Sequence, residues 1–304
     1  MAVSSKVTLR QLELFRAAAE HGSFAAASHA VFLTPNAVAL AVRELETALG
    51  VQLFVRRRAQ GLTLTPSGTH LLPAARRLLR DADDLCRRVG NVDGELSGPV
   101  GVGCYSTLAA TVLPPLMEGF GAAYPGVELS IVDGTITDLL SPLTSGMIDV
   151  LIAYRTGLPT GLEQAVLFET EAHVLLPEHH RLATRETVSL GDLMEDPLIL
   201  LDLPPSGDHT LAVLSRAGVA PKVTHRTTNF ELVRSLVARG FGYSYLIQKP
   251  QIDESYEGRR VIAKRISPPS GVETVVIAWP RGMPLTDRAR ALIDYARETV
   301  AQQQ

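Results

Sequence analysis

Basic and amide side chains in the first sixty residues have the chemistry needed to bind a nucleic acid. Arg56, Arg57 and Arg58 form a run of guanidinium groups, which pair readily with phosphates. Asn36 can hydrogen bond to adenine or to a phosphate, and Arg43 can grip a phosphate. A run of charged residues is more often only a solvated surface. Whether these residues contact a nucleic acid therefore depends on the helices and strands that position them.

Two helix patterns follow each other within residues 23–54. Ser23 is a good N-cap for the first. Thr34 is an N-cap for the second, and Pro35 occupies its first position, where a missing N–H costs nothing. Gly50 is a typical helix stop. Two short helices joined by about four residues are the helix-turn-helix pattern, whose second helix lies in the DNA major groove.

The second helix has an inner and an outer face. Val38, Val42 and Leu45 recur at helical spacing and must pack inward. The outward positions are then Asn36, Ala39, Leu40, Arg43 and Thr47. The alternative is a helical pair that serves only protein packing.

The arginine run lies between two predicted strands. Residues 51–55 favour a first strand and residues 62–65 a returning one. A basic hairpin after a helix-turn-helix is a wing, whose arginines would reach phosphates or a minor groove.

Several motifs in fixed order resemble the LysR-type transcriptional regulators. They are Leu9-Arg10-Gln11-Leu12, Gly22-Ser23-Phe24, Thr34-Pro35 to Val38, Leu45-Glu46 through Gly50, Leu53 and Phe54, and Leu64-Thr65-Pro66-Ser67-Gly68. The resemblance implies a winged helix-turn-helix DNA-binding domain over residues 1–65. The residues expected to contact double-stranded promoter DNA are Ser23, Thr34, Pro35, Asn36, Ala39, Leu40, Arg43, Arg56, Arg57 and Arg58.

The second helix of the helix-turn-helix, the recognition helix, departs from the family pattern at one point. The family usually has Ser at the position of Ala39, and often a polar residue at Leu40 or Ala41. This helix therefore offers fewer hydrogen bonds to base edges. Readout would depend on Thr34, Asn36, apolar contact with thymine methyls and DNA shape, unless the domain binds weakly.

Composition and charge fit a DNA-binding front end on a soluble body. Residues 1–94 carry 12 Lys and Arg against 8 Asp and Glu, whereas the remainder carries 17 against 24. No apolar stretch approaches a membrane span or a signal core. Cys86 and Cys104, the two cysteines, form no metal motif or disulfide framework. We expect a cytoplasmic protein without membrane contact, metal or cofactor.

A long helix is predicted to begin at Thr65 and Pro66, with Pro73 kinking it or marking a shorter first turn. Its apolar residues follow a heptad seam, which usually pairs with another helix. They are Leu71, Ala75, Leu78, Ala82, Leu85 and Val89. In the family this linker helix, here residues 66–94, dimerises the DNA-binding domains.

The rest of the chain, residues 95–304, alternates strands and helices, which predicts an α/β fold with a mostly parallel sheet. Ser and Thr lie where strands end and helices begin, the place where such sheets bind ligands. The resemblance implies a two-lobed effector domain similar to type 2 periplasmic binding proteins. Lobe 1 would span about 95–166 and 270–304, and lobe 2 about 167–269.

The resemblance further implies an effector between the lobes, of the carboxylate-bearing class that helix N-termini attract. The residues expected there are Tyr105, Ser106, Thr107, Thr135, Thr137, Asp202, Ser206, His209, Thr228, Asn229, Phe230, Tyr243 and Tyr245. Each Ser or Thr could instead be only an N-cap. Asp202 could meet an amine or hydroxyl of the ligand, or orient His209.

The sequence therefore favours a non-catalytic LysR-type regulator that binds promoter DNA and a small effector. The resemblance implies self-association as a dimer or tetramer and allows contact with RNA polymerase. One alternative is an enzyme, but no nucleophile elbow, HExxH or phosphate-binding glycine loop is present. Another is a solute-binding protein of the same two-lobed fold. Redox sensing at Cys104 is a minor alternative, because no second cysteine lies nearby.

Overall fold

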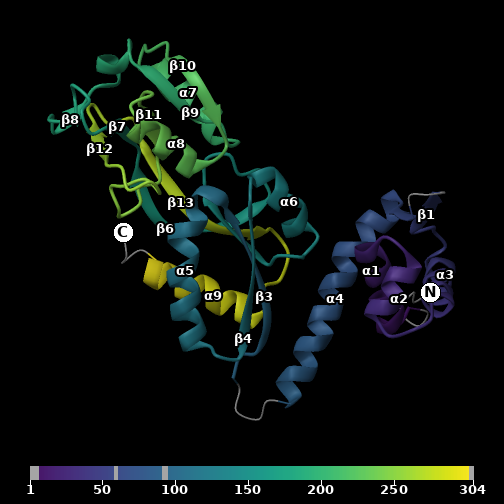
Figure 1. Cartoon of the computed structure of the whole chain (residues 1–304). Coiled ribbons are helices and arrows are strands. Elements are labelled where there is room, and N and C mark those ends of the chain that lie inside the picture. The colour runs from purple at the N-terminus through teal and green to yellow at the C-terminus, as the bar shows by residue number, and fades with distance from the viewer. Residues whose placement is uncertain (1–6, 58–60, 91–94, 301–304) are drawn as a thin grey trace.

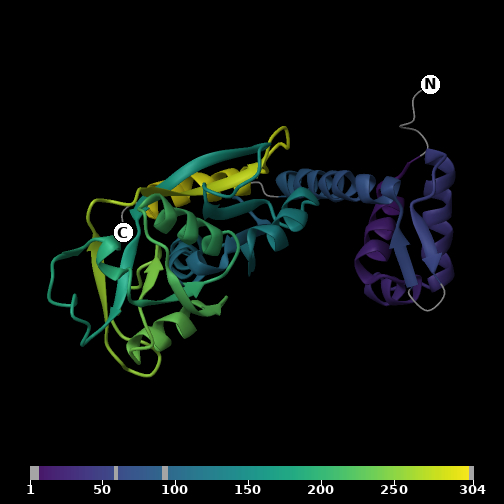
Figure 2. The ribbon, with the colours of Figure 1, turned by 90° about the horizontal axis from the view of Figure 1, so that it is seen from above.

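The computed structural model describes residues 7–57, 61–90 and 95–300. A small N-terminal domain stands apart from a larger α/β body, and the long helix α4 (Pro66–Gly90) lies between them (Figure 1). Viewed from above, the domain lies at one end of α4 and the body at the other (Figure 2).

Capping residues determine where the helices of the N-terminal domain begin and end. These helices are α1 (Leu9–His21), α2 (Phe24–Ala30) and α3 (Pro35–Leu49). Thr8, Ser23 and Thr34 cap them with their side chains, as predicted. α3 ends at Gly50, whose φ of 69° suits a glycine. α2 and α3 are bent by 107°, within the range of a helix-turn-helix.

Within the described residues, no single helix is long and apolar enough to cross a membrane. Only the bent pair formed by α2 and α3 meets that test, by length and composition alone.

The inner face of α3 packs into the core of this domain. Val38, Val42 and Leu45 are buried there with Phe15 of α1, as predicted. Ala39 is also buried, with 8% of its surface exposed, so its predicted outward position is wrong. It follows Val38 in the sequence, on the flank of the inward stripe, and its methyl group is small enough to be enclosed there.

The wing is an antiparallel hairpin of β1 (Phe54–Arg57) and β2 (Gly61–Leu64). β1 begins at Phe54 and not at residue 51 as predicted. The reason is a competing acceptor: the backbone N–H groups of Leu53 and Phe54 donate to a Glu46 carboxylate oxygen at 2.7 and 3.2 Å. Arg58 lies outside the described residues, and the side chains of Arg56 and Arg57 are not described.

α4 continues without interruption through Pro73. Its first half packs on the N-terminal domain, where Ala75 is 1% exposed and Leu71 lies against the same core. The predicted six-residue seam is therefore wrong for Leu71 and Ala75, because these two residues pack against the N-terminal domain of their own chain. Leu78 and Leu85 remain exposed, at 48% and 64%. The side chain of Val89 is not described.

Lobe 1 of the body is a five-stranded sheet in the order β4-β3-β5-β13-β6. Its elements are β3 (Gly98–Tyr105), α5 (Ser106–Ala123), β4 (Val127–Gly134), α6 (Ile136–Thr144), β5 (Val150–Tyr154), β6 (Leu162–Glu171), β13 (Val272–Pro280) and α9 (Asp287–Thr299). β3 is parallel to β4 and β5, whereas β13 is antiparallel to β5 and β6. Four of the five strands therefore run in one direction, as predicted, and β13 runs against them because the chain returns from lobe 2 in the opposite direction.

Lobe 2 contains a four-stranded sheet, β11-β7-β12-β8, beside the parallel pair β9-β10. Its elements are β7 (His173–Pro177), β8 (Thr187–Val188), β9 (Pro197–Leu201), α7 (Ser206–Arg216), β10 (Lys222–Thr227), α8 (Phe230–Ala238), β11 (Ser244–Leu246) and β12 (Val261–Ile266), with a 3-10 turn at Leu190–Leu193. A bridge between Leu198 and Tyr243 joins the two groups of strands. Because β6 pairs with β13 as far as Glu171, the chain enters lobe 2 after that residue, later than we expected.

Two arginines of α4 bind the linker to both neighbouring parts. Arg76 is 7% exposed, pairs with Glu20 of α1 at 2.9 Å and donates to the carbonyl of Ser145 at 3.4 Å. Arg80 pairs with Asp149 at 3.1 Å. We call these contacts the linker clamp. It connects the N-terminal domain and α4 to the loop between α6 and β5.

Candidate functional site

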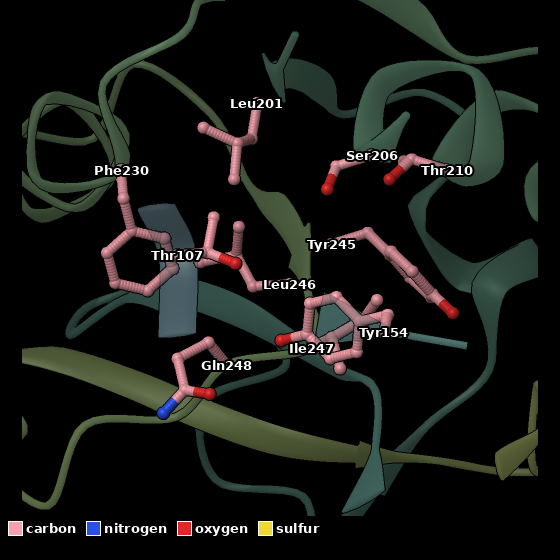
Figure 3. A pocket seen from close by; sticks show the side chains of 10 residues that line it. All are labelled: Thr107, Tyr154, Leu201, Ser206, Thr210, Phe230, Tyr245, Leu246, Ile247 and Gln248. Atoms are coloured by element: carbon pink, nitrogen blue, oxygen red, sulfur yellow. The ribbon is translucent and has the colours of Figure 1, made fainter. Parts of the chain in front are cut away.

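Three helices of the body begin around one pocket between the lobes. α5 contributes Thr107, α7 contributes Ser206 and α8 contributes Phe230, each within the first two helical residues (Figure 3). Such N-termini present free backbone N–H groups and the positive end of the helix dipole. Neither α5 nor α7 has a side-chain N-cap among the described residues. The first N–H of α7, that of Ser206, donates to the Leu203 carbonyl at 2.7 Å, so the backbone donors that face the pocket come mainly from the start of α5.

The pocket is nearly closed in this structure: its cavity volume is about 20 Å³, room for about one water molecule. Its lining combines hydroxyl groups and one amide with apolar side chains. The lining residues are Thr107, Tyr154, Leu201, Ser206, Thr210, Phe230, Tyr245, Leu246, Ile247 and Gln248. None of them carries a formal charge, so a ligand here would meet hydroxyls and helix ends.

Two of the hydroxyl groups are buried without a regular hydrogen bond. Thr107 Oγ1 and Tyr154 Oη make no hydrogen bond of regular geometry within the described part of the chain, although the Thr107 hydroxyl lies close enough to Tyr154 to offset part of the effect of burial on the pKa of Tyr154. Burial raises the pKa of Tyr154, which keeps its hydroxyl protonated and able to donate. Buried polar groups are normally hydrogen-bonded, and a buried group that lacks a hydrogen bond lowers the stability of the folded state. Both groups would gain from a polar ligand atom.

Side chains on opposite lobes hold the pocket closed. Tyr105, 1% exposed at the end of β3, donates its hydroxyl to the Leu203 carbonyl at 3.1 Å and meets Ser206 Oγ at 2.8 Å. Gln248 donates to Thr111 of α5 at 2.7 Å. The buried core is also continuous across this boundary, since Leu201 and Leu203 belong to the cluster that fills lobe 1.

A contact between a histidine and a carboxylate lies beside the pocket and also joins the lobes. His209 Nε2 of α7 approaches Glu273 Oε1 of β13 to 3.1 Å, although the angle is not that of a regular hydrogen bond. Thr156 donates to the other carboxylate oxygen at 3.0 Å. The His209 contact, followed by the hydroxyl and nearby charge, outweighs burial and lowers the pKa of Glu273.

Four of the predicted site residues line the pocket: Thr107, Ser206, Phe230 and Tyr245. Tyr105 and His209 lie at the lobe boundary beside it. The prediction missed Tyr154, Thr210 and Gln248 among the polar lining residues. The first two had usable signals, because Tyr154 ends a buried strand and Thr210 lies one helical turn after Ser206.

The remaining predicted residues do not line the pocket. Ser106 donates to Asp133 at 3.2 Å, and Asp202 forms an ion pair with Arg226 at 3.3 Å. Thr135 and Asn229 cap α6 and α8, the alternative recognised for such residues. Those outside the lining are Ser106, Thr135, Thr137, Asp202, Thr228, Asn229 and Tyr243. Tyr243 is fully enclosed in the core of lobe 2, because its backbone bridges β9.

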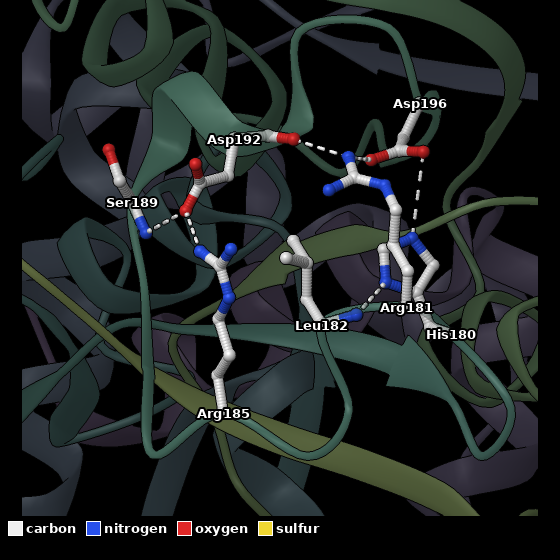
Figure 4. A network of polar contacts seen from close by, with 7 residues as sticks. All are labelled: His180, Arg181, Leu182, Arg185, Ser189, Asp192 and Asp196. Carbon is white, nitrogen blue, oxygen red and sulfur yellow. Dashed lines mark hydrogen bonds and ion pairs between the residues drawn. The ribbon is translucent and has the colours of Figure 1, made fainter.

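A second polar cluster lies between β7 and β9 in lobe 2, and its charged side chains are paired with one another (Figure 4). Arg181 donates to Asp196 at 2.7 Å, and Arg185 donates to Asp192 at 2.9 Å. His180 Nε2 lies 3.6 Å from Asp196. Because its charges are paired, this cluster fixes loops around lobe 2.

The outer face of α3 is exposed at Asn36, Leu40, Arg43 and Thr47. Arg43 Nε donates back to the Ala39 carbonyl at 3.3 Å. The hydroxyls of Ser23 and Thr34 accept the capping N–H groups of α2 and α3, and Pro35 begins α3. Contact of these residues with DNA stays a prediction.

Two protein-family models together match nearly the whole chain. A family model described as "Bacterial regulatory helix-turn-helix protein, lysR family" matches residues 9–69, and one described as "LysR substrate binding domain" matches residues 93–301. An uncharacterized HTH-type transcriptional regulator of Bacillus subtilis strain 168, YvbU, is 30% identical over 241 residues, 79% of this chain and 81% of that protein.

Two further similar proteins span nearly their full lengths. The DNA-binding transcriptional dual regulator OxyR of Escherichia coli K12 is 26% identical over 96% of this chain and 95% of its own. The crystal structure of HinK, a LysR family transcriptional regulator from Pseudomonas aeruginosa, is 36% identical with a TM-score of 0.65. It covers 97% of this chain and 99% of HinK.

Proposed function

The chain belongs to the LysR family of bacterial transcriptional regulators, and we propose that a small carboxylate in the pocket between its lobes controls its binding to promoter DNA. The observation that carries the effector proposal is the meeting of three helix N-termini around one pocket that has no charged side chain. Backbone N–H groups and helix dipoles favour an anion there.

The unpaired hydroxyls give the same pocket a second role in recognition. Thr107 and Tyr154 can both donate to a carboxylate oxygen, and such charge-assisted bonds are stronger than neutral ones. Leu201, Phe230 and Ile247 would enclose the apolar part of the molecule. Because the cavity volume is about 20 Å³ in this structure, the lobes must open to admit such an acid.

A continuous path leads from the pocket to the DNA-binding domain. β3 ends at Tyr105 beside the pocket and pairs with β4, whose last residue, Gly134, precedes α6. The loop after α6 carries Asp149, the partner of Arg80 in the linker clamp. We propose that effector binding changes lobe closure and that α6 and the clamp transmit the change to α4.

Self-association through α4 is the remaining part of the proposal. Leu78 and Leu85, seven residues apart, lie exposed on the same helix face, as in a two-helix seam. Pairing two DNA-binding domains suits an operator with two half-sites. A tetramer and contact with RNA polymerase stay predictions from the resemblance.

We do not propose peroxide sensing at Cys104, although relatives include hydrogen peroxide-inducible genes activators. Cys104 is fully buried, and burial raises the pKa of its thiol, which suppresses the reactive thiolate. The other cysteine, Cys86, is exposed on α4.

The test has two stages with the full-length protein. Selection of genomic fragments in vitro identifies bound duplexes, and the genes beside them suggest which carboxylic acids to assay by calorimetry. Thr107→Val should weaken binding of an active acid roughly 10- to 150-fold, the loss expected for a hydrogen bond to a charged group. Thr137→Val, which removes an exposed hydroxyl outside the pocket, should leave the affinity unchanged.

Two results would contradict the proposal at different points. Failure to retain any duplex at low salt would remove the DNA-binding role. Equal effector affinity in Thr107→Val and the wild type would place the effector elsewhere.

A further inference from the structure

The DNA-reading face of α3 carries an exposed apolar side chain at its centre. Leu40 is 52% exposed. Asn36 lies one turn before it, and Arg43 and Thr47 lie one and two turns after it, all on the same face. The neighbouring Ala39 is buried, so Leu40 is the side chain that α3 presents at the middle of this stripe.

The turn that leads into α3 is apolar as well. Phe32 is 93% exposed and has a φ of 54°, a left-handed conformation that is uncommon for a residue with a side chain. Leu33 beside it is 38% exposed. Exposed apolar groups therefore cover both the approach to α3 and its centre.

DNA is the occupant that the surroundings of this surface favour. Residues 1–94 carry 12 basic against 8 acidic side chains, which complements a polyanion. α2 and α3 also have the angle of a helix-turn-helix, which presents its second helix to the major groove. In that groove the C5-methyl of thymine is the apolar group that an ordinary base edge displays.

We propose that Leu40 determines operator specificity by packing on a thymine methyl group. The proposal rests on the DNA-binding function proposed above. Asn36 supplies the adjoining polar contact, since an Asn amide can pair with the N6 and N7 edge of adenine. Four residues along a helix advance about 6 Å, and base pairs are about 3.4 Å apart. The thymine therefore lies one or two base pairs from that adenine.

The test uses an operator obtained by selection with the full-length protein. Each thymine is replaced singly by deoxyuridine, which removes only the methyl group. Wild-type affinity should fall about fourfold for each half-site at one position, the factor that corresponds to burying one methyl group. In Leu40→Ala the same replacement should have no effect, because the partner of the methyl is gone.

Val51→Ala provides the matched control. Val51 is an apolar residue of the same domain, 42% exposed and outside α3, so its variant should keep the wild-type response to deoxyuridine. Thermal unfolding of each variant checks folding, and the wild-type measurements test the proposal without any substitution.

Three outcomes would overturn the proposal. Deoxyuridine could be harmless to the wild type at every position, or equally harmful to Leu40→Ala. Alternatively, Leu40→Ala could change the oligomeric state in light scattering while its DNA affinity stays unchanged, which would show that protein covers this residue. In each case an operator is still bound, so the result differs from failure of the proposed DNA-binding function.

Discussion

Replacing Tyr105 by Phe should loosen the lobe boundary while keeping its apolar packing. The change removes the hydroxyl that reaches the Leu203 carbonyl and Ser206 Oγ across the lobes. The Leu203 carbonyl keeps one donor, the N–H of Ser206 at 2.7 Å, so it is not left without a partner. We therefore expect a loss near the lower range for a buried hydrogen bond, about 1 to 2 kcal/mol.

That free energy corresponds to a factor of about 5 to 30 in the equilibrium for opening the boundary. Hydrogen exchange of the full-length protein measures it without an effector, because amide exchange reports local opening. In Tyr105→Phe, peptides that cover residues 203–209 should exchange faster by this factor. Peptides from α1 should be unaffected, since they lie in the N-terminal domain.

Tyr295→Phe is the matched control. Tyr295 lies on α9 and packs against Phe120 within lobe 1, away from the boundary between the lobes. Removing its hydroxyl should leave exchange at residues 203–209 unchanged. Equal exchange in Tyr105→Phe and the wild type would refute the inference that this hydroxyl holds the lobes together.

Three further predictions concern charge, DNA contact and assembly. Because contacts with His209 and Thr156 hold the pKa of Glu273 below its usual 4.5, the ionised carboxylate stabilises the body above that pH, and this stabilisation is lost as the pH falls below it. Thermal unfolding should therefore depend more steeply on pH below about 5 in the wild type than in Glu273→Gln, and equal slopes would argue against this stabilisation. Changing all three arginines of residues 56–58 to Ala should reduce the salt slope of DNA binding by up to about 2.7, at about 0.9 per phosphate contact, whereas an unchanged slope would remove the wing from the interface. Leu78→Asp should dissociate a dimer paired through α4, and a light-scattering mass equal to that of the wild type would refute the seam.

Short-range signals were sufficient to predict the helices of the DNA-binding domain. Ser23 and Thr34 cap their helices through N–H groups three residues away, and Gly50 ends α3 by its own conformation. Such features depend on neighbours in the sequence. The start of β1 was predicted wrongly because it depends on Glu46, which captures the N–H of Leu53 from seven residues away.

The pocket could be predicted only in part because distant segments build it. Helix starts at Thr107 and Ser206 were recognisable, but every capped helix gives a similar signal. Thr135 begins α6, yet it lies outside the pocket lining. Gln248 lies beyond the end of β11, and its role depends on contact with Thr111 of the other lobe. No local pattern indicates that contact.

Because Ala75 of α4 is buried against the DNA-binding domain, that domain and α4 form a single rigid unit. From Arg80, where the linker clamp joins α4 to the body, to Pro66 the helix spans about 21 Å, so a swing of about 9° displaces its first residue by about 3 Å. That displacement is close to the rise of one base pair, about 3.4 Å. A swing of this size about the linker clamp is therefore large enough to shift the DNA-binding domain from one base step to the next.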